Sequence, residues 1–208
     1  MYKATNPITS KEALQARLDE MHPSQVNKII DHIDDHCAAW IGRSPFIIVS
    51  TVDASGRMDV SPKGDPPGFV KVLDTKTLAI PDRIGNNRGD GFLNILETSR
   101  VGLLFVVPKR KEVLRVSGSA EIVMDEPLRE MTEVNGHRPD LLLLVRVEEA
   151  FFHCGKSMIR SRMWQPEMWG PIDGLPTYAE ALKDHGDMPD PLDSIEARMA
   201  YNESDRLY

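Results

Sequence analysis

The chain reads Phe46-Ile47-Ile48-Val49-Ser50-Thr51-Val52-Asp53-Ala54-Ser55-Gly56 at the point that decides its fold. Its first seven residues are rich in β-branched and aromatic side chains, which favour an extended strand. Asp53–Gly56 supplies the small and polar residues of a turn, and Arg57–Ser61 can return beside the first strand. The stretch therefore predicts a β-hairpin.

Two further hairpins and one long strand are expected along the chain. The expected strands are Phe69–Leu73 with Thr77–Ile80, Val101–Val107 with Val113–Val123, and the unpaired Leu141–Cys154. The turns lie at Asp74–Lys76 and Pro108–Lys111. Short strands at this regular spacing are typical of an all-β barrel or sandwich and not of a parallel sheet.

Helices are expected on both sides of this β region. Ser10 and Ser24 can cap helices over Lys11–Met21 and Gln25–Trp40, where apolar residues recur at helical spacing. Shorter helices are expected over Asp90–Thr98, from Glu126 to Val134, over Tyr178–Asp184 and over Leu192–Tyr201. With no internal repeat or composition break, we expect one domain, 1–208. It has a helical N-terminal cap (about 10–40), a barrel core (about 45–155) and an extended C-terminal tail (about 164–208).

Composition excludes several classes of protein. The net charge of −7 argues against broad nucleic-acid binding, which needs many cations against phosphates. No apolar run approaches membrane-spanning length, and the first residues lack the apolar core of a secretory signal. Cys37 and Cys154 are too few for a disulfide framework. We therefore expect a cytoplasmic protein that contacts neither nucleic acid nor membrane.

The most unusual feature is the basic loop Pro81–Asn94, which is rich in glycine and asparagine. Arg83 and Arg88 offer guanidinium forks that match phosphate oxygens. Asn86 and Asn87 add amide donors, the glycines allow close backbone approach, and the helix from Asp90 can turn its N-terminus toward an anion. The alternative is a connecting loop with solvated arginines. Its position between two hairpins favours a phosphate site.

Four features follow one another along the chain in an order that can be compared with known families. They are the hairpin 46–56, Ser61-Pro62-Lys63-Gly64, Ile80–Arg88, and Asn94-Ile95-Leu96 before Val101–Phe105. Together they resemble the pyridoxamine 5′-phosphate oxidase-like FMN-binding proteins over roughly residues 40 to 165. The chain is more narrowly similar to a subgroup with Asn-Asn-Arg in the phosphate loop and Cys-Gly-Lys after the last strand, here Cys154-Gly155-Lys156. Members of that subgroup are generally described only as FMN-binding.

The resemblance implies a mainly β fold with flanking helices, a six-stranded antiparallel split β-barrel with Greek-key connections. It also implies a homodimer with FMN in grooves at the subunit interface, lined by residues of both chains. The cofactor-binding residues that we predict on this basis are Ser61, Pro62, Lys63, Ile80, Pro81, Asp82, Arg83, Asn86, Asn87, Arg88, Asn94, Arg115, Lys156, Ser157, Arg160 and Trp164.

Roles within this set follow from the chemistry of FMN. The phosphate dianion needs cations, for which Lys63, Arg83 and Arg88 are the candidates. The flavin ring needs a flat, mostly apolar slot with hydrogen-bond donors, for which Ser61 and Arg115 are candidates. Lys156, Ser157 and Arg160 can reach the cofactor of the other subunit, and Trp164 can stack nearby. Alternatively, Arg115 and the basic cluster face solvent, and Trp164 anchors the tail.

The chain also departs from the classical oxidases. They carry an Arg-x-Val-Leu-Leu-Lys strand where this chain reads Asp59-Val60-Ser61-Pro62-Lys63-Gly64, so only the lysine is kept. Their Arg-x-His substrate segment has no counterpart after Trp164. The resemblance therefore predicts the cofactor, while the substrate stays open.

Other candidate sites are weaker. His32 and His36 have the spacing of two metal ligands on a helix, yet a third ligand is missing and a solvated acidic face is the favoured interpretation. His153 and Cys154 are adjacent on a strand and point to opposite faces, so we expect Cys154 to be a small buried residue.

The leading functional hypothesis is an FMN-dependent oxidoreductase, in which no side chain is nominated as a catalytic acid or base. A non-catalytic flavin-binding or sensing module is the first alternative. A split barrel that takes another cofactor, a deazaflavin or haem, is the second.

Overall fold

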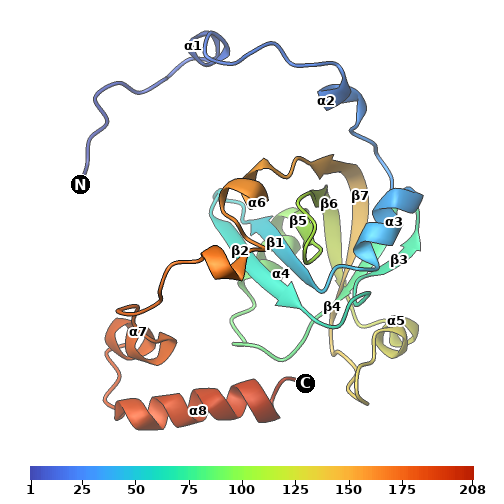
Figure 1. The fold of residues 1–208 in the computed structure, drawn as a ribbon. Coiled ribbons are helices and arrows are strands. Elements are labelled where there is room, and N and C mark those ends of the chain that lie inside the picture. The colour runs from blue at the N-terminus through green and yellow to red at the C-terminus, as the bar shows by residue number, and fades with distance from the viewer.

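The computed structural model describes residues 1–208 and is mainly β, with helices at its edges (Figure 1). The strands are β1 Phe46–Val52, β2 Met58–Gly64, β3 Lys71–Asp74, β4 Thr77–Pro81, β5 Arg100–Val106, β6 Val113–Val123 and β7 Leu142–His153. The helices are α1 Lys11–Gln15, α2 Ser24–Asn27, α3 Asp35–Ile41, α4 Asp90–Thr98, α5 Glu126–Met131, α6 Lys156–Arg160, α7 Tyr178–His185 and α8 Leu192–Asp205, with a 3₁₀ turn, η1, at Pro166–Met168.

The seven strands form one antiparallel sheet in the order β2-β1-β5-β6-β7-β4-β3. The three expected hairpins and the long final strand are confirmed, and together they make seven strands, one more than the six that the resemblance implies. The short β3 pairs only with β4 at one edge of the sheet. No hydrogen-bonded pairing joins β3 to β2 at the other edge, so the curved sheet is open between these two strands.

The first hairpin owes its turn to Asp53. The Asp53 carboxylate accepts hydrogen bonds from the backbone N–H groups of Ser55 and Arg57, both at 2.9 Å. The hydrogen bond from the Ser55 hydroxyl, followed by that from the Arg57 backbone, lowers the pKa of Asp53 to about 2. Strand pairing then runs in register from Val52 opposite Met58 to Phe46 opposite Gly64.

Strand alternation gives the sheet two different faces. On β1, Ile47, Val49 and Thr51 are buried, while the residues between them are only partly covered. Inward-facing side chains of the other strands complete the core, and Phe105 and Leu114 are fully buried in it. Helix α3 closes the core from outside the sheet through Cys37 and Ile41.

The prediction of one helix over Gln25–Trp40 is wrong. The chain is helical only at Ser24–Asn27 and again from Asp35. Between them, Ile30 exchanges two backbone hydrogen bonds with Ala150 of β7, and the Ile33 N–H donates to Thr75 O at 2.7 Å. Pairing with the sheet therefore replaces the helical hydrogen bonds in this segment.

Both ends of the chain reach beyond the sheet. Helices α1 and α2 bury no side chain and lie on an arm that extends away from the strands (Figure 1). Helices α7 and α8, close to their predicted bounds, pack on each other and bury Ala179 and Ile195. No helix of the protein combines the length and apolar composition that crossing a membrane requires.

The two cysteines differ in their surroundings. Cys37 is buried, and this burial raises the pKa of its thiol to about 12. Cys154 is exposed, which corrects the expectation that it is a small buried residue. The reason is that β7 ends at His153, so the chain has left the sheet when it reaches Cys154.

The shift in register between β6 and β7 depends on Gly118. A Cβ atom at this position would lie 1.9 Å from the carbonyl oxygen of Arg146. We expect Gly118→Ala to lower the free energy of unfolding by about 1–3 kcal/mol or more, as overpacking does. Gly102→Ala on β5 is the control, because its Cβ would lie 4.0 Å from the nearest atom, Ser50 Cβ. Equal denaturation midpoints for the two variants would contradict this role of Gly118.

Candidate functional site

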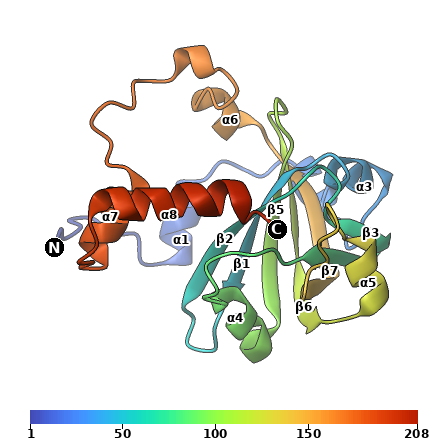
Figure 2. The ribbon, with the colours of Figure 1, turned by 90° about the horizontal axis from the view of Figure 1, so that it is seen from below.

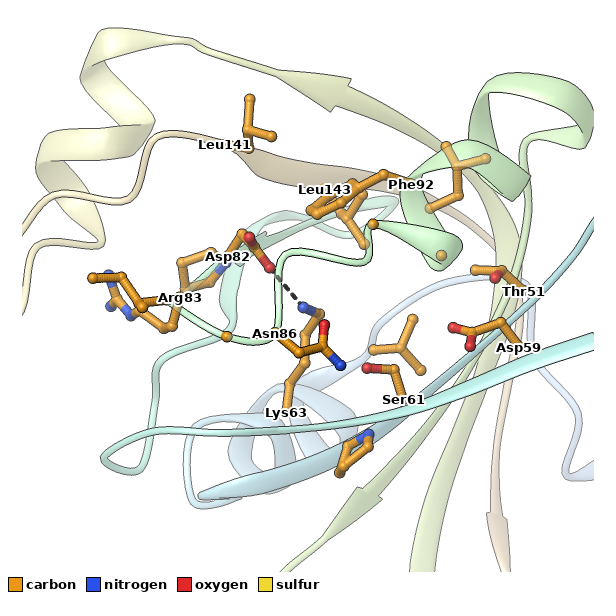
Figure 3. A pocket seen from close by; sticks show the side chains of 18 of the residues that line it. Thr51, Asp59, Ser61, Lys63, Asp82, Arg83, Asn86, Phe92, Leu141 and Leu143 are labelled. Carbon is orange, nitrogen blue, oxygen red and sulfur yellow. Dashed lines mark hydrogen bonds and ion pairs between the residues drawn. The ribbon is translucent and has the colours of Figure 1, made fainter. Parts of the chain in front are cut away.

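A cavity of about 570 Å³ lies in the opening between β2 and the segment that follows β4 (Figure 3). This volume falls in the range of pockets that bind small organic ligands. Eight of the predicted cofactor residues line the cavity: Ser61, Pro62, Lys63, Pro81, Asp82, Arg83, Asn86 and Asn87. These eight residues therefore gather around one cavity, on one wall and in the loop above it, and their binding of a cofactor stays a prediction.

The period of β2 places its polar residues in the cavity. Asp59, Ser61 and Lys63 alternate with more exposed residues, so they share the inner face of the strand. In the β1–β2 register, Ser61 lies opposite Val49 and Asp59 opposite Thr51, and all four line the cavity. The first hairpin, β1 and β2, thus forms one wall of the cavity.

Lys63 reaches across the opening of the sheet. Its Nζ donates to Asp82 Oδ1 at 2.8 Å, and it lies 5.7 Å from the centre of the Phe92 ring (Figure 3). Both members of the ion pair are only partly buried, so the pair adds little stability by itself. The ion pair instead orients Lys63, because it holds the ammonium group at the cavity.

Arg83 is anchored on the side away from Asp59 (Figure 3). Its Nε donates to Asp65 Oδ2 at 2.6 Å and its Nη2 to the backbone oxygen of Thr132 at 2.7 Å. The Asp65 side chain is 1% exposed, and a carboxylate buried to this extent requires such partners. A third donor, the Tyr208 hydroxyl, reaches Asp65 Oδ1 at 2.6 Å. Arg83 is therefore fixed at the rim of the cavity.

The loop between Arg83 and α4 contains two left-handed residues, Asn87 at φ 57° and Gly89 at φ 67°. Asparagine and glycine are the residues that tolerate this conformation best. The Asn86 side-chain oxygen accepts from the Arg88 N–H at 3.1 Å, which tightens the turn. As a result, Asn86 and Asn87 line the cavity, whereas Arg88 does not.

Arg88 is largely exposed and donates from Nε to Asp90 Oδ2 at 2.6 Å. This hydrogen bond raises the pKa of the guanidinium above its usual value. The arginine predicted as a phosphate ligand is thus paired with the first residue of α4 and stands beside the cavity.

Two other predicted residues support the walls from behind. Asn94 is buried and donates from Nδ2 to Thr51 Oγ1 at 3.0 Å, which fixes the hydroxyl of a lining residue. Ile80 is fully buried in the core beside Pro81.

Five predicted residues lie outside the cavity of their own chain. Arg115 is on the outer face of the sheet, with its guanidinium 4.8 Å from the centre of the Phe151 ring. Lys156, Ser157 and Arg160 are on α6, which Figure 2 shows on the opposite side of the molecule from α4. The Trp164 indole donates to Arg110 O at 2.7 Å, as expected for an anchor of the tail. Their contribution to the cofactor site of a second chain stays a prediction.

Sequence reasoning missed several lining residues. Asp59 is the most informative, because it places a carboxylate opposite the Lys63 and Arg83 end (Figure 3). The alternation of β2 could have identified it, since it precedes Ser61 and Lys63 by steps of two. A Cβ on Gly91 would lie 3.3 Å from Asp59 Oδ2, so the glycine makes room for this carboxylate. Phe92, Leu141 and Leu143 form an apolar wall that no motif indicated.

The lining is suited to holding a polar ligand with a flat apolar part. One end of the cavity is lined by the ammonium of Lys63, by Arg83 and by the side-chain amides of Asn86 and Asn87. Apolar side chains of the core and of α4 line the rest of the cavity. Its ionisable side chains are Asp59, Lys63, Asp82 and Arg83, and it contains no histidine, cysteine, methionine or tyrosine.

Comparison with solved structures returns remote similarities. HupZ from Group A Streptococcus is 24% identical, with 58% of this chain and 93% of that chain covered and a TM-score of 0.47. A protein from Lactobacillus delbrueckii described as a candidate pyridoxamine 5′-phosphate oxidase is 23% identical, with 59% and 95% covered and a TM-score of 0.47. An FMN-binding protein from Syntrophomonas wolfei is 11% identical, with 55% and 82% covered and a TM-score of 0.44. Among curated proteins, none matches the chain.

A match to a family model is more decisive, because it covers more than half of the chain. The model describes pyridoxamine 5′-phosphate oxidase and matches residues 33–154, from just before α3 to just beyond the end of β7. All seven strands and the whole cavity lie within this match. The chain therefore belongs to the pyridoxamine 5′-phosphate oxidase family.

Proposed function

We propose that this protein is an FMN-binding flavoprotein of the split-barrel type and acts as an FMN-dependent oxidoreductase. The observation that carries the proposal is the cavity itself, which joins cationic and amide groups to an apolar wall inside the family-matched region. FMN would supply hydride or electron transfer, while the protein supplies binding, orientation and electrostatics.

The phosphate end of FMN fits the loop side of the cavity. Lys63 and Arg83 are oriented there by Asp82 and Asp65, and Asn86 and Asn87 add neutral donors. Charge-assisted hydrogen bonds of this kind are the strong contacts of phosphate sites. The ring would lie along Phe92 and Leu143, with Ser61 available as a hydrogen-bonding group.

We also propose a homodimer. Met58 and Val60 of β2 and Phe46 of β1 are exposed on the outer face of the sheet. A second hollow of about 270 Å³ on this face is lined by Ile48, Leu104 and Phe151 together with Arg115. Exposed apolar side chains on one face of a sheet favour an interaction surface there. A second copy on this face would also bring basic residues near Lys156 to each cofactor.

The alternative cofactors make different demands on the cavity. Haem iron requires an axial histidine, cysteine, methionine or tyrosine, and one chain supplies none of these to the lining. A deazaflavin shares the flat ring and phosphate of FMN, so the same side chains suit it. Mass spectrometry of the released ligand distinguishes the two. The free thiols of Cys37 and Cys154 fit the reducing cytoplasm that we propose as its compartment.

Lys63 provides the test of cofactor binding. We expect the purified protein to bind FMN and turn yellow, and Lys63→Gln to weaken binding roughly 10-fold, because hydrogen bonds to charged groups contribute about 1.5–3 kcal/mol. Lys76→Gln is the control, since Lys76 pairs with Asp31 at 2.8 Å and lies outside the cavity lining. Titration followed by flavin fluorescence measures both. A wild-type protein that remains colourless and ignores added FMN would overturn the proposed function.

Reduction of the bound flavin distinguishes an enzyme from a binding module. The module has support in the lining, which contains no histidine or cysteine to act as an acid or nucleophile. We expect NADH or NADPH to bleach the visible flavin bands in an anaerobic stopped-flow experiment, and an added acceptor to restore them over repeated turnovers. Inert, tightly held FMN would instead assign the protein to the module class.

The dimer proposal is tested by light scattering. We expect a mass twice the 23.4 kDa of one chain. Val60→Asp should shift the population toward monomer, because it places a charge in an apolar interface. Met124→Asp is the control, since Met124 is as exposed as Val60 but lies beyond the end of β6. A monomeric wild-type protein would contradict the proposal.

A further inference from the structure

Tyr208 connects the C-terminal segment to the rim of the cavity. Its hydroxyl donates to Asp65 Oδ1 at 2.6 Å, and the Arg83 guanidinium lies 5.7 Å from the centre of its ring. The ring also stacks on His137, with 6.2 Å between centroids and 25° between planes. Arg83 belongs to the cavity lining, so this contact lies at the rim of the cavity.

The segment that Tyr208 terminates is otherwise self-contained. Helices α7 and α8 pack against each other, and Lys183 Nζ donates to the backbone oxygens of Met188 and Asp190 between them. Every side-chain hydrogen bond, ion pair and ring contact between this helical pair and the barrel comes from Tyr208. Figure 2 shows α8 directed toward the barrel, and the hydrogen bond from Tyr208 to Asp65 places the last residue just beyond the end of β2. One side chain therefore joins this segment to the site.

The contact changes the electrostatics of Arg83. Asp65 binds both the Arg83 Nε and the Tyr208 hydroxyl, so part of its negative charge is directed away from the arginine. The hydrogen bond to Asp65 raises the pKa of Tyr208 above its usual value, so the hydroxyl keeps its proton and donates at neutral pH.

We propose that Tyr208 is a positioning residue for the cavity: docking of residues 192–208 on Asp65 and Arg83, and binding of an anionic ligand beside Arg83, stabilise each other. The identity of that ligand as FMN rests on the proposed function. The coupling is reciprocal by thermodynamic necessity, so each event must favour the other by the same factor.

The experiment measures both sides of this coupling. Hydrogen exchange of residues 192–208 is followed by mass spectrometry with no ligand, with FMN and with inorganic phosphate, in the wild type and in Tyr208→Phe. FMN affinity and the ³¹P resonance of bound FMN are measured in parallel. Tyr201→Phe is the matched control, because Tyr201 lies on α8 in the same C-terminal segment and is exposed.

We expect FMN to slow exchange of residues 192–208 in the wild type and in Tyr201→Phe, and to leave it unchanged in Tyr208→Phe. Loss of the hydroxyl should weaken FMN binding roughly 5-fold or more, the lower end of ordinary coupling between sites, and shift the phosphorus resonance. Exchange of β5 and β6 should be the same in all three proteins, which excludes a general loss of structure.

The outcomes separate this inference from the proposed function. If the wild type binds FMN and Tyr208→Phe binds it equally well with no ligand effect on the tail, the coupling is wrong and the flavoprotein proposal stands. If FMN does not bind but phosphate slows tail exchange in the wild type and not in Tyr208→Phe, the coupling stands and the flavoprotein proposal fails. If neither ligand alters exchange of the tail, the coupling is overturned.

Discussion

The structure of the site depends on one constraint, the missing pairing between β2 and β3. An edge strand normally exposes unpaired backbone groups and invites association, and proteins cover or modify such edges. Here the opening is covered by the loop after β4, and Lys63 on β2 reaches it through Asp82. The cavity exists because the sheet does not close at this point, and its polar lining exists because β2 turns Asp59, Ser61 and Lys63 toward the opening.

The loop that follows β4 is held in place by a different interaction, the hydrogen bonds of the Asp65 carboxylate. Asp65 is the most buried carboxylate of the ion pairs near the cavity, and breaking a pair of this kind is costly because a buried charge loses its partner. Its bonds to Arg83 and Tyr208 fix the start of the loop, whereas the exposed Arg88–Asp90 pair contributes little to stability. The loop is thus anchored at Arg83, and Asn86 and Asn87 farther along it line the cavity.

Local pattern predicted much of this fold. The first hairpin and helix α4 over Asp90–Thr98 were accessible, because turn chemistry and strand alternation are encoded over a few residues. The eight predicted residues that line the cavity came instead from the family resemblance. Contacts between residues far apart in the sequence could not be predicted from local pattern. The helix expected over Gln25–Trp40 is interrupted because Ile30 pairs with Ala150 of β7. This strand lies far away in the sequence, so the local pattern around Ile30 does not reveal the pairing. Tyr208 lies 143 residues from Asp65, so no local signal could place them together.

The charges of the cavity bear on how a phosphate could be held. Lys63 and Arg83 are balanced by Asp82 and Asp65, and Asp59 adds a further negative charge to the lining. A dianion brought to this lining needs additional cations. In a chain of net charge −7, the segment from Cys154 to Trp164 carries lysine and arginine without any acidic residue, and it lies away from its own cavity. A two-fold interface uses the same surfaces on both chains, so each copy would donate this basic segment and receive its partner's. The imbalance within one chain is therefore the strongest physical argument that the proposed FMN site is completed by a second chain.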